Sequence, residues 1–284
     1  MKSVVITGVS SGIGYATCKL FLNEGYHVFG SIRNKSDAKV LSNQFSEKFI
    51  PLIFDTRDIS ALCIARDIVS KTLGGRGLSA LINNAGIAAM GPIELLPSSE
   101  FKEQIETNVV GTFNCIQAFL PLLQPTLETK EPMPGRIINI SSALGGKIGY
   151  PFYGAYCASK HALEGLSEAL RRELYVHGIK VIIVAPGAII TPIWSKAEEN
   201  NSAKVYTDTV YEDSFNKTMK NLKSLGAGGL LPATVAKTIL KAVETPRPKL
   251  RYYFLKEIML NLLYYTPRKL LDVLICYHLG LKRK

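Results

Sequence analysis

Short runs of apolar and β-branched residues alternate with longer segments of helical periodicity up to about residue 187. A strand covered on both faces has a continuous apolar run, and helices between such strands make the sheet parallel. The pattern therefore predicts an α/β fold with a doubly wound parallel sheet and helices on both faces. The predicted strands are SVVITG (3–8), HVFGSI (27–32), FIPLIFD (49–55), SALINNAG (79–86), GRIINIS (135–141) and IKVIIVAPG (179–187), and the clearest helical segments lie at 12–25, 58–73 and 98–123.

Residues 191–230 interrupt this alternation. The segment is polar at 198–201, contains the aromatic residues Trp194, Tyr206, Tyr211 and Phe215, and closes with a glycine-rich stretch at 226–229. Long segments of this kind inside compact domains are commonly functional. We predict a main domain over 1–245, with a substrate lid at about 191–230, and a basic, apolar helical extension over 246–284.

Length and composition favour one large domain with a substantial core, at 284 residues and 47% hydrophobic. The N-terminal apolar run at 4–6 is too short for a signal peptide, and no stretch approaches the ~18 apolar residues of a membrane span. Five cysteines without a CxxC pattern indicate buried reduced thiols, and four scattered histidines give no reason to expect a metal. A cytoplasmic location is expected.

The net charge of +11 is concentrated in the C-terminal tail, where residues 245–284 hold nine Lys/Arg and two acids. This distribution disfavours a nucleic-acid-binding domain. Residues 251–284 predict two short apolar helices broken at Pro267, the first with a polar stripe of Lys256, Glu257 and Asn261. The tail could cap the substrate cleft, pack at a subunit interface, or contact an anionic membrane surface peripherally.

The turn TGVSSGIG (7–14) follows a predicted strand and precedes a predicted helix. Glycines let the backbone approach a pyrophosphate, and the positive end of the next helix favours it. The turn therefore predicts dinucleotide binding by Gly8, Ser10, Ser11, Gly12, Ile13 and Gly14.

The ends of the next two strands bear on the choice of dinucleotide. Ile32 and Arg33 stand where an NAD site has a carboxylate, and a guanidinium matches a 2′-phosphate, so we expect NADP(H) rather than NAD(H). The alternative is a solvated loop arginine. Asp55 would accept a hydrogen bond from the adenine amino group. The backbone would pass close to the adenosine ribose at Asn84, Ala85 and Gly86, although ordinary turn residues remain an alternative here.

Tyr156 and Lys160 are one of four Tyr–Lys pairs with a spacing of four, so the spacing alone does not identify a site. Only this pair follows a predicted strand that brings serines, Ser141 and Ser142, to the same sheet edge. Residues at i and i+4 share one helix face, and a nearby ammonium lowers the pKa of a phenol. We therefore predict that this pair is catalytic.

Together, TGVSSGIG, NNAG, Asn108 in NVVG, Ser142, YCASK and PGAIIT resemble the short-chain dehydrogenase/reductase family, over essentially residues 1–245. The sequence is most similar to the family's 17β-hydroxysteroid and retinol dehydrogenases. The resemblance implies a Rossmann-type fold, a nicotinamide cofactor and a homodimer or homotetramer. It implies a catalytic tetrad of Asn108, Ser142, Tyr156 and Lys160, the last two also contacting the cofactor, and a nicotinamide cradle formed by Pro186, Gly187, Ile189 and Thr191.

One spacing departs from the family pattern. Ser142 precedes Tyr156 by fourteen residues, one more than expected, because the loop contains Gly145 and Gly146. Ser142 remains the candidate, and Ser141 is the alternative, expected to face away by the period-two rule of a strand.

The resemblance implies hydride transfer between NADP(H) and a small apolar ketone or alcohol of steroid, retinoid or lipid type. Residues expected around this substrate are Leu144, Tyr150, Phe152, Ile193 and Trp194, with Met90 and Ile148 as further candidates. Two other readings stay open. One is a nucleotide-sugar epimerase or dehydratase relative, and the other is a non-catalytic NADP-binding regulator or membrane-associated protein with the same fold.

Overall fold

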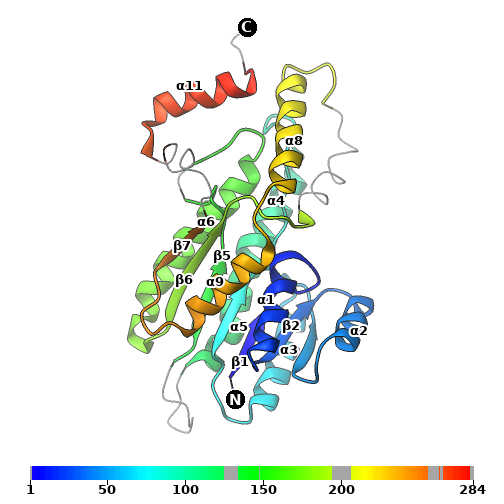
Figure 1. The fold of residues 1–284 in the computed structure, drawn as a ribbon, viewed down its shortest axis with the longest axis vertical. Helices are drawn as coiled ribbons and strands as arrows, with labels where there is room; N and C mark the ends of the chain where they lie inside the picture. The colour runs from blue at the N-terminus through cyan, green and yellow to red at the C-terminus, as the bar shows by residue number, and fades with distance from the viewer. Residues whose placement is uncertain are drawn as a thin grey trace.

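A seven-stranded parallel sheet forms the centre of the computed structural model, which describes residues 2–124, 134–146, 148–193, 206–254, 262 and 265–281 (Figure 1). The strand order is β3-β2-β1-β4-β5-β6-β7. The order reverses between β1 and β4, and sheets of this kind bind ligands at the carboxyl ends of the strands beside such a point. The strands are β1 (Ser3–Ile6), β2 (His27–Ile32), β3 (Phe49–Ile53), β4 (Ala80–Asn83), β5 (Arg136–Ile140), β6 (Lys180–Pro186) and β7 (Arg251–Phe254).

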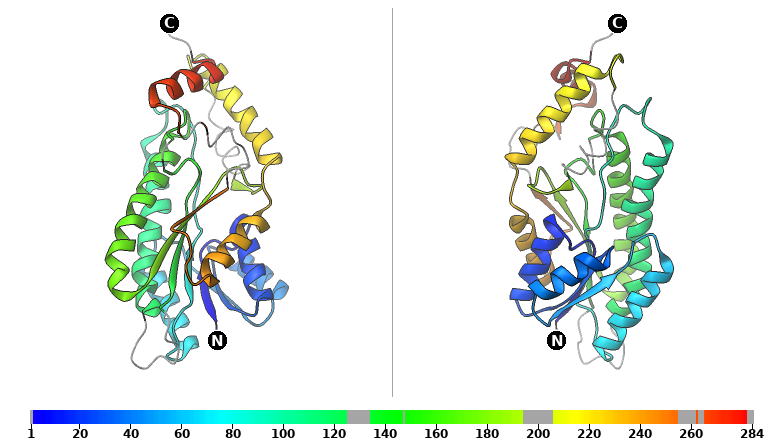
Figure 2. Two further views of the ribbon diagram at one scale, coloured as in Figure 1. Left: turned by 60° about the vertical axis from the view of Figure 1, so that its left-hand side comes forward. Right: turned by 90° about the vertical axis from the view of Figure 1, so that its right-hand side faces the viewer.

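Helices cover both faces of the sheet, as predicted for a Rossmann-type fold (Figure 2). Side chains alternate across each strand, so that Val4 and Ile6 of β1 join one core layer and Val5 joins the other. The first layer is closed by α1 (Gly12–Asn23), α2 (Lys35–Gln44) and α9 (Pro232–Glu244). The second is closed by α3 (Ile59–Leu73) and α5 (Gly111–Leu123), with α4 (Ser98–Ile105) and α6 (Gly154–Glu173) on the same side.

The seventh strand corrects the prediction for the tail. Residues 251–254 were expected to begin a helix, but they form β7, which pairs in parallel with the edge strand β6. Tyr and Phe have high strand propensity, and the open edge of β6 offers unpaired backbone groups. The pairing of β7 with β6 joins segments that are distant in the sequence, so the local pattern of residues 251–254 did not predict a strand. The predicted polar stripe of the first tail helix lies outside the described residues.

The second predicted tail helix is present as α11 (Arg268–Leu279), which begins directly after Pro267. Its inner face packs against α8 (Glu212–Ala227), where Leu279 joins a cluster with Phe215. Both helices lie at the end of the molecule farthest from the N-terminus (Figures 1 and 2). Residues 194–205 of the predicted lid, including Trp194, lie outside the described residues. Across the described ranges, no helix is long and apolar enough to span a bilayer.

Candidate active site

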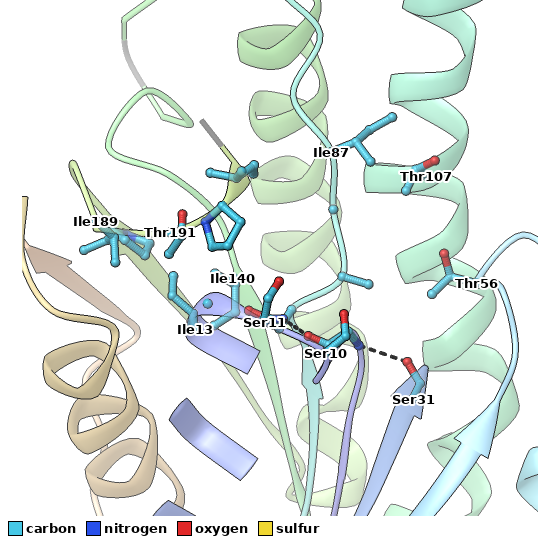
Figure 3. Close-up of a pocket in the computed structure, with 18 of the residues that line it drawn as sticks. Ser10, Ser11, Ile13, Ser31, Thr56, Ile87, Thr107, Ile140, Ile189 and Thr191 are labelled. Atoms are coloured by element: carbon cyan, nitrogen blue, oxygen red, sulfur yellow. Dashed lines mark hydrogen bonds between the residues drawn. The ribbon is translucent and has the colours of Figure 1, made fainter. Parts of the chain in front are cut away.

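A cavity of about 220 Å³ opens at the carboxyl ends of the strands on both sides of the reversal point (Figure 3). Most of the residues predicted from the sequence line it. They are Gly8, Ser10, Ser11, Gly12, Ile13, Arg33, Asp55, Asn84, Ala85, Gly86, Ser142, Tyr156, Lys160, Pro186, Gly187, Ile189, Thr191 and Ile193. The structure thus gathers residues from the ends of six strands, β1 to β6, into one site.

The glycine-rich turn is held by its neighbours in a shape that leaves room for a ligand. Gly8 and Gly12 have φ of 73° and 59°, a backbone region that disfavours other residues. The Gly8 amide donates to the Ser31 hydroxyl at 2.9 Å (Figure 3), and the Asn84 amide group donates to the Gly8 carbonyl at 3.0 Å. A Cβ on Gly14 would lie 2.1 Å from that carbonyl oxygen. Gly14 therefore packs α1 against the turn, while its neighbours face the cavity.

This turn and its surroundings fit a dinucleotide. The helix α1 begins at Gly12, so its free backbone amides and positive end face the cavity. A side chain on Gly12 would fill the space beside Thr191, with its Cβ 3.2 Å from the Thr191 methyl group. The lack of side chains keeps the cradle open on the side where a pyrophosphate would bind.

The end of the cavity formed by β2 and β3 carries Arg33 and the carboxylate of Asp55. Arg33 is exposed at the rim, and none of residues 33–36, which directly follow β2, is an acid. Arg57 donates to both carboxylate oxygens of Asp55, at 2.9 and 2.8 Å. These hydrogen bonds hold the pKa of Asp55 below its usual range, with a smaller contribution from Arg33. Asp55 is therefore ionised and already paired, which leaves Arg33 available for an anionic group such as a 2′-phosphate.

Tyr156 is buried at the opposite end of the cavity, two residues into α6. Burial raises its pKa to about 12, and a hydrogen bond from Ser142 acts in the opposite direction. The expected lowering of this pKa by Lys160 is not found, because burial raises the pKa and the lowering comes from Ser142. The phenol is consequently protonated at neutral pH, the form that can donate a proton.

Lys160 lies one helical turn after Tyr156 and faces the same cavity. Its ammonium donates to the Ile140 carbonyl at 2.9 Å and lies 5.8 Å from the centre of the Tyr156 ring. Burial lowers the pKa of Lys160 to about 8. The side chain is thus mainly cationic at neutral pH and close to its titration point.

Asn108 lies in a π-helical turn, η1 (Glu106–Val110), between α4 and α5. Turns of this type are frequent at functional sites. Its side-chain oxygen accepts from the Ile87 amide at 2.9 Å, and its nitrogen donates to the Ile87 carbonyl and the Ser159 hydroxyl, each at 3.0 Å. Asn108 does not line the cavity. It fixes the segment after β4, beside Gly86 and Lys160.

Three of the predicted substrate residues pack around Tyr156. Leu144, Tyr150 and Ile193 share an apolar cluster with it, and Met90 is buried in the same cluster. Phe152 instead joins a neighbouring aromatic cluster, with its ring centre 5.5 Å from that of Phe215. Tyr150 takes part in both clusters, so that apolar side chains continue from Tyr156 towards α8 and α11.

Several residues at the cavity were missed by the sequence reasoning. They are Ser31, Phe54, Thr56, Ile87, Thr107, Ile140 and Pro192. Ser31, Phe54 and Ile140 lie inside the strands predicted from the sequence, and they could have been found by treating the last residues of each predicted strand as candidates. Thr107 gave no local signal, because helical packing alone places it at the cavity (Figure 3). Within the described ranges, no group of three His, Cys, Asp or Glu side chains could hold a metal ion.

A family model described as short chain dehydrogenase matches residues 2–202. The chain therefore belongs to the short-chain dehydrogenase/reductase family and is an oxidoreductase of that family. This confirms the resemblance inferred from the motifs and agrees with the sheet and the cavity.

Individual relatives span nearly the whole chain. The NADPH-dependent 3-dehydrocapnine reductase of Ornithobacterium rhinotracheale is 40% identical over 274 residues, 96% of this chain and 95% of that protein. The 3-ketodihydrosphingosine reductase of Bacteroides thetaiotaomicron is 34% identical, covering 87% of this chain and 86% of that protein. The solved structure of ElxO with NADP bound has a TM-score of 0.69 at 27% identity, covering 89% of this chain and 95% of that one. These similarities agree with the expectation of NADP(H).

Proposed function

We propose that this protein uses NADPH to reduce a ketone on an apolar substrate to the corresponding alcohol. The observation that carries the proposal is the convergence of Ser142, Tyr156 and Lys160 on the cavity formed by the glycine-rich turn. Two similar proteins are named as reductases, one of them as a reductase of 3-ketodihydrosphingosine. Tyr156 is protonated at neutral pH, the state in which it can donate a proton to a carbonyl oxygen.

Each residue of the site would have a defined part in this reaction. When bound, NADPH supplies the hydride that adds to the carbonyl carbon, and the carbonyl oxygen gains negative charge. Ser142 would donate a hydrogen bond to that oxygen, and Tyr156 would transfer its phenolic proton to it, which gives the neutral alcohol. Lys160 would bind the ribose hydroxyls of the cofactor and stabilise the phenolate that remains.

Arg33 would select NADPH by pairing with the 2′-phosphate, and the residues around Tyr156 would select the substrate. The cluster of Leu144, Tyr150 and Ile193 offers mainly apolar surface next to the proton donor, which suits a hydrocarbon or ring system better than a sugar. This favours a lipid-like ketone over a nucleotide sugar.

The direct test is a panel of steroid, retinoid and long-chain aliphatic ketones, each mixed with NADPH or NADH. We expect NADPH oxidation with at least one apolar ketone and much slower oxidation of NADH. Tight NADPH binding without turnover of any carbonyl would favour the non-catalytic regulator. Turnover of nucleotide sugars without net oxidation would favour the epimerase alternative.

A peripheral membrane contact is the second part of the proposal. The outer face of α11 exposes Leu270, Val273, Leu274 and Tyr277, with exposed fractions between 44% and 87%. These residues recur at the spacing of one helix face, opposite the inward-facing Leu271 and Leu279. Arg268 and Lys269 precede them, which suits an anionic lipid surface.

Vesicles with and without anionic lipid test this contact. Cosedimentation with anionic vesicles, lost when Val273 and Tyr277 are both changed to Ser, is the expected result. Absence of cosedimentation would contradict the membrane contact.

For the protein in solution, we propose a cytoplasmic location and a homodimer or homotetramer. Light scattering would measure the oligomeric state.

A further inference from the structure

Glu164 is a buried carboxylate beside the active site that the proposed reaction does not use. It lies on α6, one turn after Lys160 and two turns after Tyr156, so the three side chains follow one another along one face of the helix. Its exposed fraction is 7%. A carboxylate is rarely buried this deeply unless it is paired.

Both carboxylate oxygens of Glu164 have partners from other parts of the fold. The Ser141 hydroxyl donates to Oε1 at 2.5 Å. The Arg251 guanidinium, at the start of β7, forms an ion pair with Oε2. Arg251 also lies over the Tyr253 ring, 4.5 Å from its centre. Glu164 therefore connects α6, the end of β5 and the C-terminal strand.

The two glycines that lengthen the serine loop pack directly on this ion pair. A Cβ on Gly145 would lie 2.2 Å from the Ser141 hydroxyl and 2.6 Å from Glu164 Oε1. A Cβ on Gly146 would lie 2.7 Å from Arg251 Nη1 and 2.9 Å from Glu164 Oε2. The loop that carries Ser142 thus follows the surface of the carboxylate, where side chains would not fit.

The same loop is fixed on its other side by β6. The Ser141 amide donates to the Val184 carbonyl at 2.8 Å, and the Ala143 amide donates to the Pro186 carbonyl at 2.7 Å. Ser142 lies between these two backbone hydrogen bonds. Its position relative to Tyr156 therefore depends on β6 on one side and on the buried carboxylate on the other.

We propose that Glu164, held by Arg251, is a positioning residue that sets the Ser142 hydroxyl against Tyr156. The inference rests on the proposed reduction, in which Ser142 binds the carbonyl oxygen. It explains the fourteen-residue spacing, because the extra glycine lets the loop close over the ion pair. It also makes β7 a part of the support of the active site.

The test compares Glu164→Gln with Glu168→Gln on the same helix. Glu168 pairs with Arg172 at 3.3 Å, and this pair is exposed to solvent, so the second variant controls for the loss of a charge pair on α6. With a ketone identified from the panel, we expect kcat of Glu164→Gln to fall about ten- to a hundredfold, since displacing a catalytic group by about 1 Å has this effect. The affinity for NADPH should be unchanged, and Glu168→Gln should match the wild type.

Two further variants separate positioning from folding. Arg251→Lys keeps the charge but not the fork of donors, so its kcat should lie between that of the wild type and that of Arg251→Met. Ser141→Ala removes only one hydroxyl, and it should lower kcat even if the Glu164 variant does not fold. In these assays kcat is expressed per NADPH-binding site. If kcat stayed within about twofold of the wild type in both Glu164→Gln and Ser141→Ala, the proposal would be overturned.

A crystal structure of Glu164→Gln gives an outcome that does not depend on the substrate. The proposal expects Ser142 to move away from Tyr156, and an unchanged Ser142 would contradict it. If the wild-type protein bound NADPH but reduced no ketone, the proposed function would fail, while this structural comparison would still decide the role of Glu164.

Discussion

Lys160 and Tyr156 show how burial sets the protonation state of an active site. Burial raises the pKa of Tyr156 to about 12 and lowers that of Lys160 to about 8. Both shifts have the same cause, because a buried site disfavours the charged form of each group. At neutral pH, the result is a neutral proton donor next to a cation, which is the combination that ketone reduction needs.

The affinity for NADPH should depend on pH through Lys160. Because this side chain is cationic only below its pKa, binding should be tight below pH 8 and about tenfold weaker well above it, the typical effect of one charge-assisted hydrogen bond. Fluorescence titrations between pH 6 and 10 measure this. The variant Lys160→Met should bind weakly at every pH, and a wild-type profile without any decrease above pH 8 would contradict the assignment.

Arg33 should determine the choice between the two nicotinamide cofactors. Arg33→Ala removes the guanidinium at the rim and should weaken NADPH binding about ten- to a hundredfold, as expected for a lost charge-assisted pair. NADH, which lacks the 2′-phosphate, should bind with nearly unchanged affinity. An equal loss of affinity for NADPH and NADH would show that Arg33 does not bind the 2′-phosphate.

At the scale of elements, α1 packs so closely against the glycine-rich turn that adding one methyl group at the contact should disturb it. Gly14→Ala would place its Cβ 2.1 Å from the Gly8 carbonyl oxygen. The turn or the helix must then move, and we expect a loss of about 1–3 kcal/mol in the free energy of unfolding together with weaker NADPH binding. Urea denaturation and cofactor titration measure the two effects.

Gly165→Ala is the matched control on another helix. Gly165 is exposed on α6, and a Cβ there would meet nothing within 4 Å. Alanine has the higher helix propensity, so this variant should gain about 0.5–1 kcal/mol and bind NADPH normally. Equal destabilisation of both variants would contradict the role given to the turn.

Much of the fold was predictable because its strands are local and continuous. The six predicted strands are all present, because a parallel strand that is buried on both faces can be recognised from its continuous apolar run alone. The strand β7 was missed because its only signal, a short run of aromatic residues, depends on the open edge of β6. The helix after Pro267 was predicted correctly, because proline marks a helix start locally.

The site could be located from the sequence, but its electrostatics could not. Strand ends meet at one edge of a parallel sheet, so the glycine-rich turn, Ser142 and Tyr156 were expected in one place. The pKa of Tyr156 is set mainly by burial, which raises it, so the lowering predicted from its neighbour Lys160 was not found. The pairing of Glu164 with Arg251 spans 87 positions and left no pattern in either segment.

At the scale of the whole molecule, the two halves have separate tasks. The half formed by β1, β2, β3 and α1 presents the glycine-rich turn and Arg33, which suit a cofactor. The other half carries Ser142, Tyr156 and Lys160 and the apolar clusters that continue towards α8 and α11. Reduction of a ketone should therefore be separable from dinucleotide binding by mutation of Ser142 or Tyr156, whereas Lys160 would serve both.

The most direct test of the central claim is the single-turnover rate of Tyr156→Phe with saturating NADPH and an active ketone. This variant removes only the phenolic hydroxyl, so NADPH should bind with wild-type affinity, while reduction should slow by about 10²–10⁴, the contribution of a positioned acid. Reduction at the wild-type rate would show that this hydroxyl does not donate the proton, and the proposed reaction would have to be abandoned.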